Sequence, residues 1–182
     1  QGGGLDPAGI ADELDDRERG LRPYRGGARS DDIRDDDRPR ELPPGLAPDT
    51  PEAVDALADL GIEVLIDGYN VGGRIGFEGF SEREGRERVV TLGRMLARAG
   101  CPVTVVFDAR DVEGRERFEA TGGVTVRFSS GQIADDFIVA EAHRRGGAIA
   151  VITNDRELRE RSAAEGAVVV WSDALIAWAE RV

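Results

Sequence analysis

The chain has 182 residues; its 24 basic residues are all arginine and stand against 36 acidic residues, which gives a formal charge of −12. The absence of lysine excludes P-loop nucleotide hydrolysis and Schiff-base chemistry, because both need a lysine amine. A single cysteine, Cys101, excludes an internal disulfide framework. A single histidine, His143, is too few for a histidine-rich metal site and gives little support for a Ser-His-Asp triad. Any catalytic chemistry must therefore rest on carboxylates.

Residues 1–50 are charged and rich in glycine and proline, with 13 acidic residues and 8 arginines. Such a composition offers little apolar surface for a core, so we expect a linker or tail that is poorly ordered on its own. The domain should occupy residues 51–182. No stretch approaches the roughly 18 apolar residues of a membrane span, and no signal-peptide pattern is present. We therefore expect a soluble, cytoplasmic protein without a membrane partner.

From Thr50 onward, apolar runs of strand length alternate with amphipathic segments. The first helix is predicted from Thr50-Pro51-Glu52, a typical helix start, and continues through Val54, Leu57 and Leu60. The strand-like runs, apolar at nearly every position, cover residues 63–66, 103–107, 124–128, 148–153 and 167–171. Further helices are predicted at residues 81–99, 132–145 and 155–164, and after residue 171. This alternation predicts an α/β fold: a three-layer α/β/α sandwich with a mostly parallel central sheet.

Aspartates end or follow three of the predicted strands, at Asp67, Asp108 and Asp155. Because the C-terminal ends of parallel strands share one edge of a sheet, where ligands bind, these side chains should converge. A further pair, Asp135 and Asp136, begins a predicted helix, where the helix dipole favours negative charge. Carboxylates about 4 Å apart repel by roughly 4 kcal/mol at an effective dielectric of about 20. A hard divalent cation is the natural counter-charge, which favours phosphodiester cleavage as the chemistry.

Each of these acids also has a purely structural explanation. Asp155 can serve only as a helix N-cap, and Asp108 can form an Asx-turn or pair with a nearby arginine. One member of the pair Asp135 and Asp136 can face solvent. Asp67 is the hardest to explain in this way, because it directly follows an apolar strand, where burial is expected.

Other conspicuous residues are expected to have structural roles. His143 should lie at the surface near a helix end, and Cys101 should be a small buried filler. Either Ser172 or Asp173 should cap the last helix. The segment 72–76 is rich in glycine but lacks the GxGxxG spacing, and we expect it to form a flexible loop over the cleft.

Four motifs follow one another in a specific order and spacing: Asp67-Gly68-Tyr69-Asn70-Val71, Val106-Phe107-Asp108-Ala109, Ala134-Asp135-Asp136-Phe137-Ile138 and Thr153-Asn154-Asp155. Together they resemble the NYN domain of the PIN-like ribonuclease superfamily, in particular its YacP-like bacterial branch found in actinobacteria. The resemblance runs from about residue 43 to the end of the chain. It implies a PIN-like fold and a metal-dependent endoribonuclease that uses Mg²⁺ or Mn²⁺.

Carried over residue by residue, the resemblance implies both metal ligands and catalytic residues. The metal ligands would be Asp67, Asp135, Asp136 and Asp155, where Asp136 matches the second acid of a pair found in related eukaryotic NYN ribonucleases. Asn70 matches the motif asparagine, expected to orient Asp67 or a metal-bound water, and Asp108 matches a frequent outer member of the site. The catalytic set is therefore Asp67, Asn70, Asp108, Asp135, Asp136 and Asp155. The acidic pair, where bacterial relatives have Asp-Ser, and the glycine-rich loop depart from the family pattern.

The overall charge is unusual for a protein that acts on RNA. Residues 51–182 carry 23 acidic residues and 16 arginines, a net charge of −7, whereas RNA binders are usually basic. Local arginines can still bind phosphate, because the guanidinium fork suits it. The RNA-binding arginines are expected in or next to loops beside the cleft: Arg74, Arg110, Arg115, Arg117 and Arg127. We expect the RNA to be single-stranded, with the ribosome as a candidate partner for tighter binding.

Three functions are compatible with these observations. The first is the metal-dependent endoribonuclease. The second is a non-catalytic RNA-binding or interaction module that keeps the fold, which the acidic surface and charged tail favour. The third is a phosphohydrolase or receiver-type domain, because acids at strand ends also suit phosphoryl transfer, but such sites usually place a lysine beside the phosphate.

Overall fold

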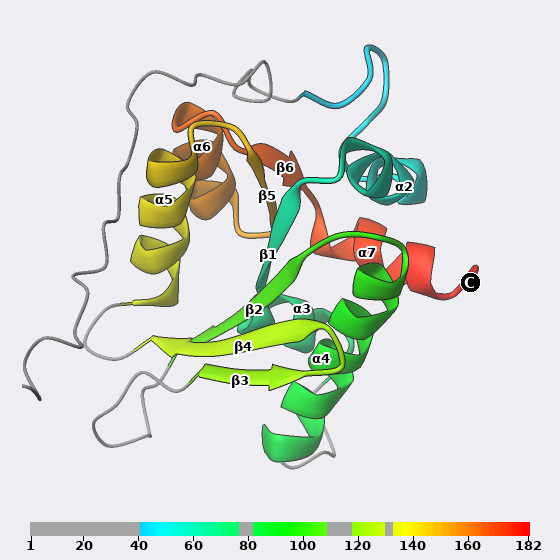
Figure 1. The fold of residues 1–182 in the computed structure, drawn as a ribbon, viewed down its shortest axis with the longest axis vertical. Coiled ribbons are helices and arrows are strands. Elements are labelled where there is room, and N and C mark those ends of the chain that lie inside the picture. Colours follow the sequence, from blue (N-terminus) through cyan, green and yellow to red (C-terminus); the bar gives the residue numbers. More distant parts are fainter. Residues whose placement is uncertain (1–40, 77–81, 109–117, 130–132) are drawn as a thin grey trace, which may run out of the picture. The chain divides into compact units, whose positions relative to one another are not determined.

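The computed structural model describes residues 41–76, 82–108, 118–129 and 133–182. Within these ranges the chain forms a six-stranded sheet with the order β3-β4-β2-β1-β5-β6 (Figure 1). Its strands are β1 (Glu63–Asp67), β2 (Val103–Asp108), β3 (Phe118–Thr121), β4 (Val124–Ser129), β5 (Ile149–Ile152) and β6 (Val168–Val170). All neighbouring strands pair in parallel except β3, which pairs antiparallel with β4 at the edge. Residues 1–40, most of the predicted tail, lie outside the described residues.

Helices cover both faces of this sheet. They are α2 (Pro51–Leu60), α3 (Gly68–Arg74), α4 (Glu82–Arg98), α5 (Ala134–Arg145), α6 (Arg156–Ala164) and α7 (Ser172–Ala179). Helices α5 and α6 lie on one face, and α2, α4 and α7 lie on the other (Figure 1). The predicted three-layer α/β/α sandwich with a mostly parallel sheet is confirmed.

The continuous apolar runs of the strands follow from this double coverage. In β1, Val64 and Ile66 belong to the core under α2, α4 and α7, whereas Leu65 points into the core under α5 and α6. All three side chains are at most 1% exposed. Because each such buried side chain contributes about 1.5–3 kcal/mol, both faces of the central strands must be apolar for the sheet to be stable.

The structure corrects the expectation of a flexible glycine loop at residues 72–76. Helix α3 extends through Arg74, so Gly72 and Gly73 are helical, and Gly72 is buried. Gly68 allows this helix to start directly at the sheet: a Cβ atom there would lie 2.4 Å from the Phe107 ring and 2.8 Å from the carbonyl oxygen of Val106. A larger residue would push α3 away from β2, so the motif glycine has a packing role.

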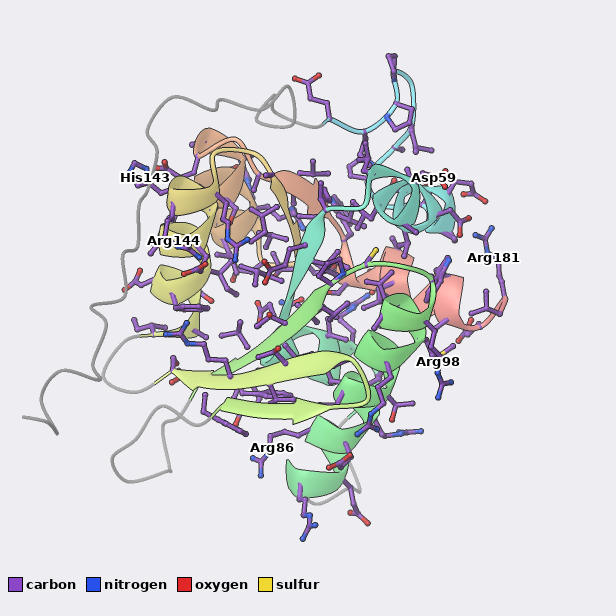
Figure 2. The ribbon with its side chains drawn as sticks, in the orientation of Figure 1. Asp59, Arg86, Arg98, His143, Arg144 and Arg181 are labelled. Atoms are coloured by element: carbon purple, nitrogen blue, oxygen red, sulfur yellow. The ribbon has the colours of Figure 1, made fainter. Side chains whose placement is uncertain are left out.

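The structure also tests the predicted positions of Thr50, Cys101 and His143. Thr50 is the N-cap position of α2, but its hydroxyl donates to the carbonyl oxygen of Ala47, at 2.8 Å, instead of capping the helix. Cys101 is buried, as predicted. Figure 2 shows that His143 and Arg144 extend from the side of α5 that faces away from the sheet, which agrees with the predicted surface position of His143. No helix in the described ranges is long and apolar enough to span a membrane.

Candidate functional site

The predicted convergence occurs at the C-terminal ends of β1, β2 and β5. Strand β1 lies between the other two, with Asp67 in register with Val106 of β2, and Ile66 in register with Ile152 of β5. Asp67 therefore lies inside this edge of the sheet, beside Thr153, which directly follows β5. The topology brings residues that are far apart in the sequence to one place.

Asp67 is a buried carboxylate held by two hydrogen bonds. Its side chain is the N-cap of α3, where Oδ1 accepts from the backbone N–H of Asn70 at 3.2 Å, and Oδ2 accepts from the Thr153 hydroxyl at 2.9 Å. Burial raises the pKa of Asp67 to about 6, against the lowering effect of these bonds. The negative charges of Asp135 and Asp155 contribute to this rise. The three acids are thus close enough for their charges to act on one another.

Thr153 joins two of these acids. Its side chain is fully buried; the hydroxyl donates to Asp67 and accepts from the backbone N–H of Asp155 at 3.0 Å. Asp155 is the N-cap of α6, as the structural explanation predicted, with Oδ1 accepting from the backbone N–H of Leu158 at 2.9 Å. Asp155 is exposed, so its remaining carboxylate oxygen can serve a ligand as well.

Asn70 connects this edge to α7. Its Oδ1 accepts from the backbone N–H of Asn154 at 2.7 Å and from the Ser172 hydroxyl at 2.8 Å. Ser172 thus caps no helix with its side chain but bonds to a residue 102 positions earlier. Neither Thr153 nor Ser172 was predicted to have a role in the site, and for Ser172 no sequence signal could have revealed the contact.

The adjacent acids Asp135 and Asp136, in the first turn of α5, have different surroundings. The pKa of Asp135 is raised, first by burial and then by the charge of Asp155. Asp136 is half exposed and forms an ion pair with Arg161 of α6, at 2.7 Å. Asp135 therefore belongs electrostatically with Asp67 and Asp155, whereas an arginine already balances the charge of Asp136.

Asp108 lies further from the centre of the site. It is the last residue of β2, two positions beyond the residue that pairs with Asp67, and it is in register with Ser129 of β4. Its charge is not among those that raise the pKa of Asp67. The outer role that the resemblance implied for Asp108 stays a prediction.

The donor chemistry of the site fits a hard divalent cation. Asp67, Asp135 and Asp155 offer carboxylate oxygens, the ligands that Mg²⁺ prefers, and a bound cation would offset both the burial and the mutual repulsion that raise the pKa of Asp67. Among the described residues, however, no three histidine, cysteine, aspartate or glutamate side chains form a closed group that could hold a metal ion. The fit thus rests on charge and donor type.

The predicted RNA-binding arginines are differently placed. Both nitrogens of the Arg74 guanidinium fork bind Asp173, with Nε to Oδ1 at 2.7 Å and Nη2 to Oδ2 at 2.8 Å. The guanidinium of Arg127 stacks on the ring of Phe137, with Cζ 3.6 Å from the ring centroid. Arg110, Arg115 and Arg117 lie outside the described residues. Of these candidates, Arg74 is therefore engaged by a carboxylate.

Comparison with known proteins agrees with this architecture. The model of the YacP-like NYN domain matches residues 64–182. The crystal structure of Rae1 (YacP) from Bacillus subtilis is similar, with a TM-score of 0.55 and 26% identity over 65% of this chain and 74% of the other. A mutant of Rae1 from the same organism also has a TM-score of 0.55, with 24% identity over 66% of this chain and 76% of the other. No curated protein matches the chain.

The family match covers the strands and helices that carry every described site residue. The sandwich described above is accordingly the PIN-like fold of YacP. The chain belongs to the YacP-like NYN domain family, a family of ribonuclease type.

Proposed function

We propose that this protein is an endoribonuclease that hydrolyses RNA phosphodiester bonds with the help of Mg²⁺ or Mn²⁺ held by Asp67, Asp135 and Asp155. One observation carries the proposal: the carboxyl group of Asp67 is buried with a pKa of about 6, and the charges of Asp135 and Asp155 raise that pKa. Such an arrangement disfavours the ionised form unless a cation binds. Membership of a ribonuclease-type family supplies the reaction class.

A divalent cation bound there would lower the pKa of an attacking water and neutralise charge on the phosphate. The chain's own residues fix the acids in place beforehand. Thr153 holds Asp67 from β5, and the backbone N–H of Leu158 holds Asp155 at the start of α6. Because these carboxylates are already ordered, less conformational entropy is lost when they bind a ligand.

Arg161 gives the two acids of α5 different tasks in this proposal. Its ion pair with Asp136 holds that carboxylate toward α6, so Asp135 is the member of the pair assigned to the metal. Asp136 then has a positioning role through Arg161, and Asp108 an outer role in orienting water or substrate.

We propose single-stranded RNA as the substrate. With a net charge of −7 over residues 51–182, the domain offers few cationic groups for the repeated phosphate contacts that duplex binding requires. A larger RNA-containing partner such as the ribosome would raise the local RNA concentration, and for that reason it remains our candidate for a docking partner.

The experiment compares cleavage of end-labelled single-stranded RNA by the wild type, Asp67→Asn and Glu63→Gln, with Mn²⁺, with Mg²⁺ and with EDTA. We expect metal-dependent cleavage by the wild type and a rate at least about 100-fold lower for Asp67→Asn. Glu63 is the matched control, since it lies at the other end of β1. Equal cleavage by the wild type and Asp67→Asn would contradict the proposal.

A non-catalytic RNA-binding module is the second candidate function. It is favoured by the lack of a closed metal-binding group among the described side chains. RNA binding by the wild type that is unaffected by Asp67→Asn, together with intact RNA at every metal concentration, would establish this alternative.

A further inference from the structure

The side-chain amide of Asn70 is fixed in one orientation. The Asn154 backbone N–H can only donate, so the atom it reaches at 2.7 Å must be the amide oxygen, Oδ1. The Ser172 hydroxyl donates to the same oxygen at 2.8 Å. Both lone pairs of Oδ1 are thus used, and this oxygen is not available as a metal ligand.

The opposite end of the same amide is available to a ligand. Nδ2 carries two N–H donors, and it has no acceptor within the part of the chain that the structure describes. Asn70 is half-buried, but Nδ2 is not among the buried polar atoms that lack a partner, so solvent reaches it. The backbone N–H of Asn70 binds Asp67 at 3.2 Å, which places Asn70 in the first turn of α3, beside the central acid.

We propose that Asn70 donates a hydrogen bond from Nδ2 to a non-bridging oxygen of the RNA phosphate, and that Ser172 is the positioning residue that holds the amide for this contact. The inference rests on the proposed function and identifies the part of the substrate that Asn70 contacts. A neutral donor is well suited to this place, because it binds the anionic phosphate without an ion pair to the neighbouring acids. The carboxylates serve the cation, and the amide serves the phosphate.

The surroundings of Ser172 explain why this residue is suited to the task. It is fully buried at the first position of α7, so its hydroxyl has no competing solvent. The next residue, Asp173, binds Arg74 with its carboxylate and approaches Oδ1 of Asn154 with its backbone N–H, at 3.4 Å. The start of α7 is therefore tied to α3 and to the segment after β5, and Ser172 cannot move independently of Asn70.

The test uses three variants beside the wild type. Asn70→Asp keeps an acceptor for Asn154 and Ser172 but replaces the amide donor by a carboxylate oxygen. Ser172→Ala removes the positioning hydroxyl without changing charge. Ser162→Ala is the matched control, because Ser162 is also fully buried and its hydroxyl has no hydrogen-bond partner among the described residues.

With Mn²⁺ and single-stranded RNA, we expect Asn70→Asp to lower kcat by about 30-fold and Ser172→Ala by about 5-fold, with a smaller change in KM, since the contact strengthens in the transition state. Ser162→Ala should cleave at the wild-type rate. Calorimetric titration should show that Asn70→Asp binds Mn²⁺ at least as tightly as the wild type. Wild-type kcat in Asn70→Asp, or equal kcat in Ser172→Ala and Ser162→Ala, would overturn the inference.

A second measurement separates failure of this inference from failure of the proposed function. In EDTA, the NMR signals of the Asn70 side-chain amide, assigned by their absence in Asn70→Asp, should shift when RNA is added to the wild type. The shift should be smaller in Ser172→Ala than in Ser162→Ala. If the wild type does not cleave RNA, the nuclease proposal fails while this shift still supports the phosphate contact; unchanged amide signals would refute the contact even in an active enzyme.

Discussion

The two ends of β1 both carry an acid, and the protein treats these two charges in opposite ways. At the first residue, Glu63, Arg145 binds Oε2 at 2.8 Å and the Thr104 hydroxyl donates to Oε1 at 3.2 Å. At the last residue, Asp67, the hydrogen bonds come from the neutral groups of Asn70 and Thr153, and the charges that act on its carboxyl group are those of the acids Asp135 and Asp155. One end of this strand therefore carries an acid that an arginine neutralises, and the other end carries an acid that neighbouring acids repel.

Helix α5 repeats this contrast along its own length. At its end, Glu141 forms ion pairs with Arg144 and Arg145. In its first turn, Asp135 is partly buried and is repelled by Asp155, and the positive charge of Arg161 offsets only part of the resulting rise in its pKa. Elsewhere in the described structure, arginines form ion pairs with acids such as Glu63 and Glu141. A cluster of acids that is only partly neutralised therefore indicates a site where a ligand supplies the missing positive charge.

The largest expected effect tests this distinction between two adjacent residues of α5. We expect Asp135→Asn to lower metal-dependent RNA cleavage by about 1,000-fold, or about 4 kcal/mol, because it removes an acid that none of the described arginine side chains binds directly. Asp136→Asn should lose less than about 10-fold, because Arg161 already binds that carboxylate. Single-turnover cleavage rates at saturating Mn²⁺ measure both values, and equal losses would show that the ion pair does not separate the two roles.

Metal binding should also stabilise the folded protein. At a Mn²⁺ concentration about 100 times Kd, the free energy of unfolding should rise by about 2.7 kcal/mol. The rise should disappear in Asp67→Asn and persist in Glu63→Gln, since Glu63 lies at the opposite end of β1 and is bound by Arg145. Thermal unfolding with and without Mn²⁺ measures this difference, and equal stabilisation of all three proteins would place the cation elsewhere.

The raised pKa of Asp67 predicts a pH dependence of stability without metal. The folded protein keeps the proton on this carboxyl up to about pH 6, whereas the unfolded chain releases it near 3.8. Stability should therefore fall as the pH rises between these values and stay lower above them, by up to about 3 kcal/mol. Asp67→Asn removes this loss but weakens a hydrogen bond worth about 1 kcal/mol, so it should gain about 2 kcal/mol at about pH 8.

Urea unfolding of the wild type and Asp67→Asn at about pH 4 and about pH 8, in EDTA, measures this effect. At the lower pH the gain should vanish, because Asp67 is then protonated in the folded protein. Glu63→Gln should lower stability at both pH values, since it removes the negative charge that pairs with Arg145. A gain in Asp67→Asn that did not depend on pH would show that packing, and not charge, determines it.

Much of this edge could be predicted from the sequence, because its elements obey local rules. The apolar run before Asp67 indicated a strand, and the acids Asp135 and Asp136 indicated the start of a helix. In a parallel sheet, acids at the C-terminal ends of the strands then have to lie at the same edge. Strand β3 was not predicted, because its four residues, 118–121, include only two apolar positions. Helix α3 was missed as well, since its glycines are typical of loops until Phe107 is known to lie against Gly68.

The partners of the site residues could not be predicted in the same way. Asn70 and Ser172 are bonded across 102 residues, and neither local pattern contains the other. Likewise, the sequence offers Arg74 as a candidate for phosphate, but only the packing of α7 against α3 shows that Asp173 occupies its guanidinium fork. Residue type predicted the chemistry available at the edge, whereas tertiary contacts decide which groups remain available to a substrate.

The smallest expected effect concerns the ion pair between Arg74 of α3 and Asp173 of α7. Asp173→Asn removes the negative charge opposite Arg74, so the guanidinium becomes available to RNA phosphate, and RNA affinity should rise by about 3-fold, or about 0.7 kcal/mol. The loss in stability should stay below about 1 kcal/mol, because both side chains are largely exposed, at 53% for Arg74 and 41% for Asp173. Fluorescence anisotropy with labelled RNA in EDTA measures the affinity.

The double variant Arg74→Gln/Asp173→Asn separates this explanation from a general charge effect. The comparison is with the single variant Arg74→Gln, because the double variant has the net charge of the wild type. If Arg74 makes the new phosphate contact, adding Asp173→Asn to Arg74→Gln should leave the affinity unchanged. If the gain came only from reducing the negative charge of the domain, Asp173→Asn should raise the affinity as much in Arg74→Gln as in the wild type. Loss of the gain in the Arg74→Gln background would thus show that the ion pair with Asp173 keeps the Arg74 guanidinium from binding RNA.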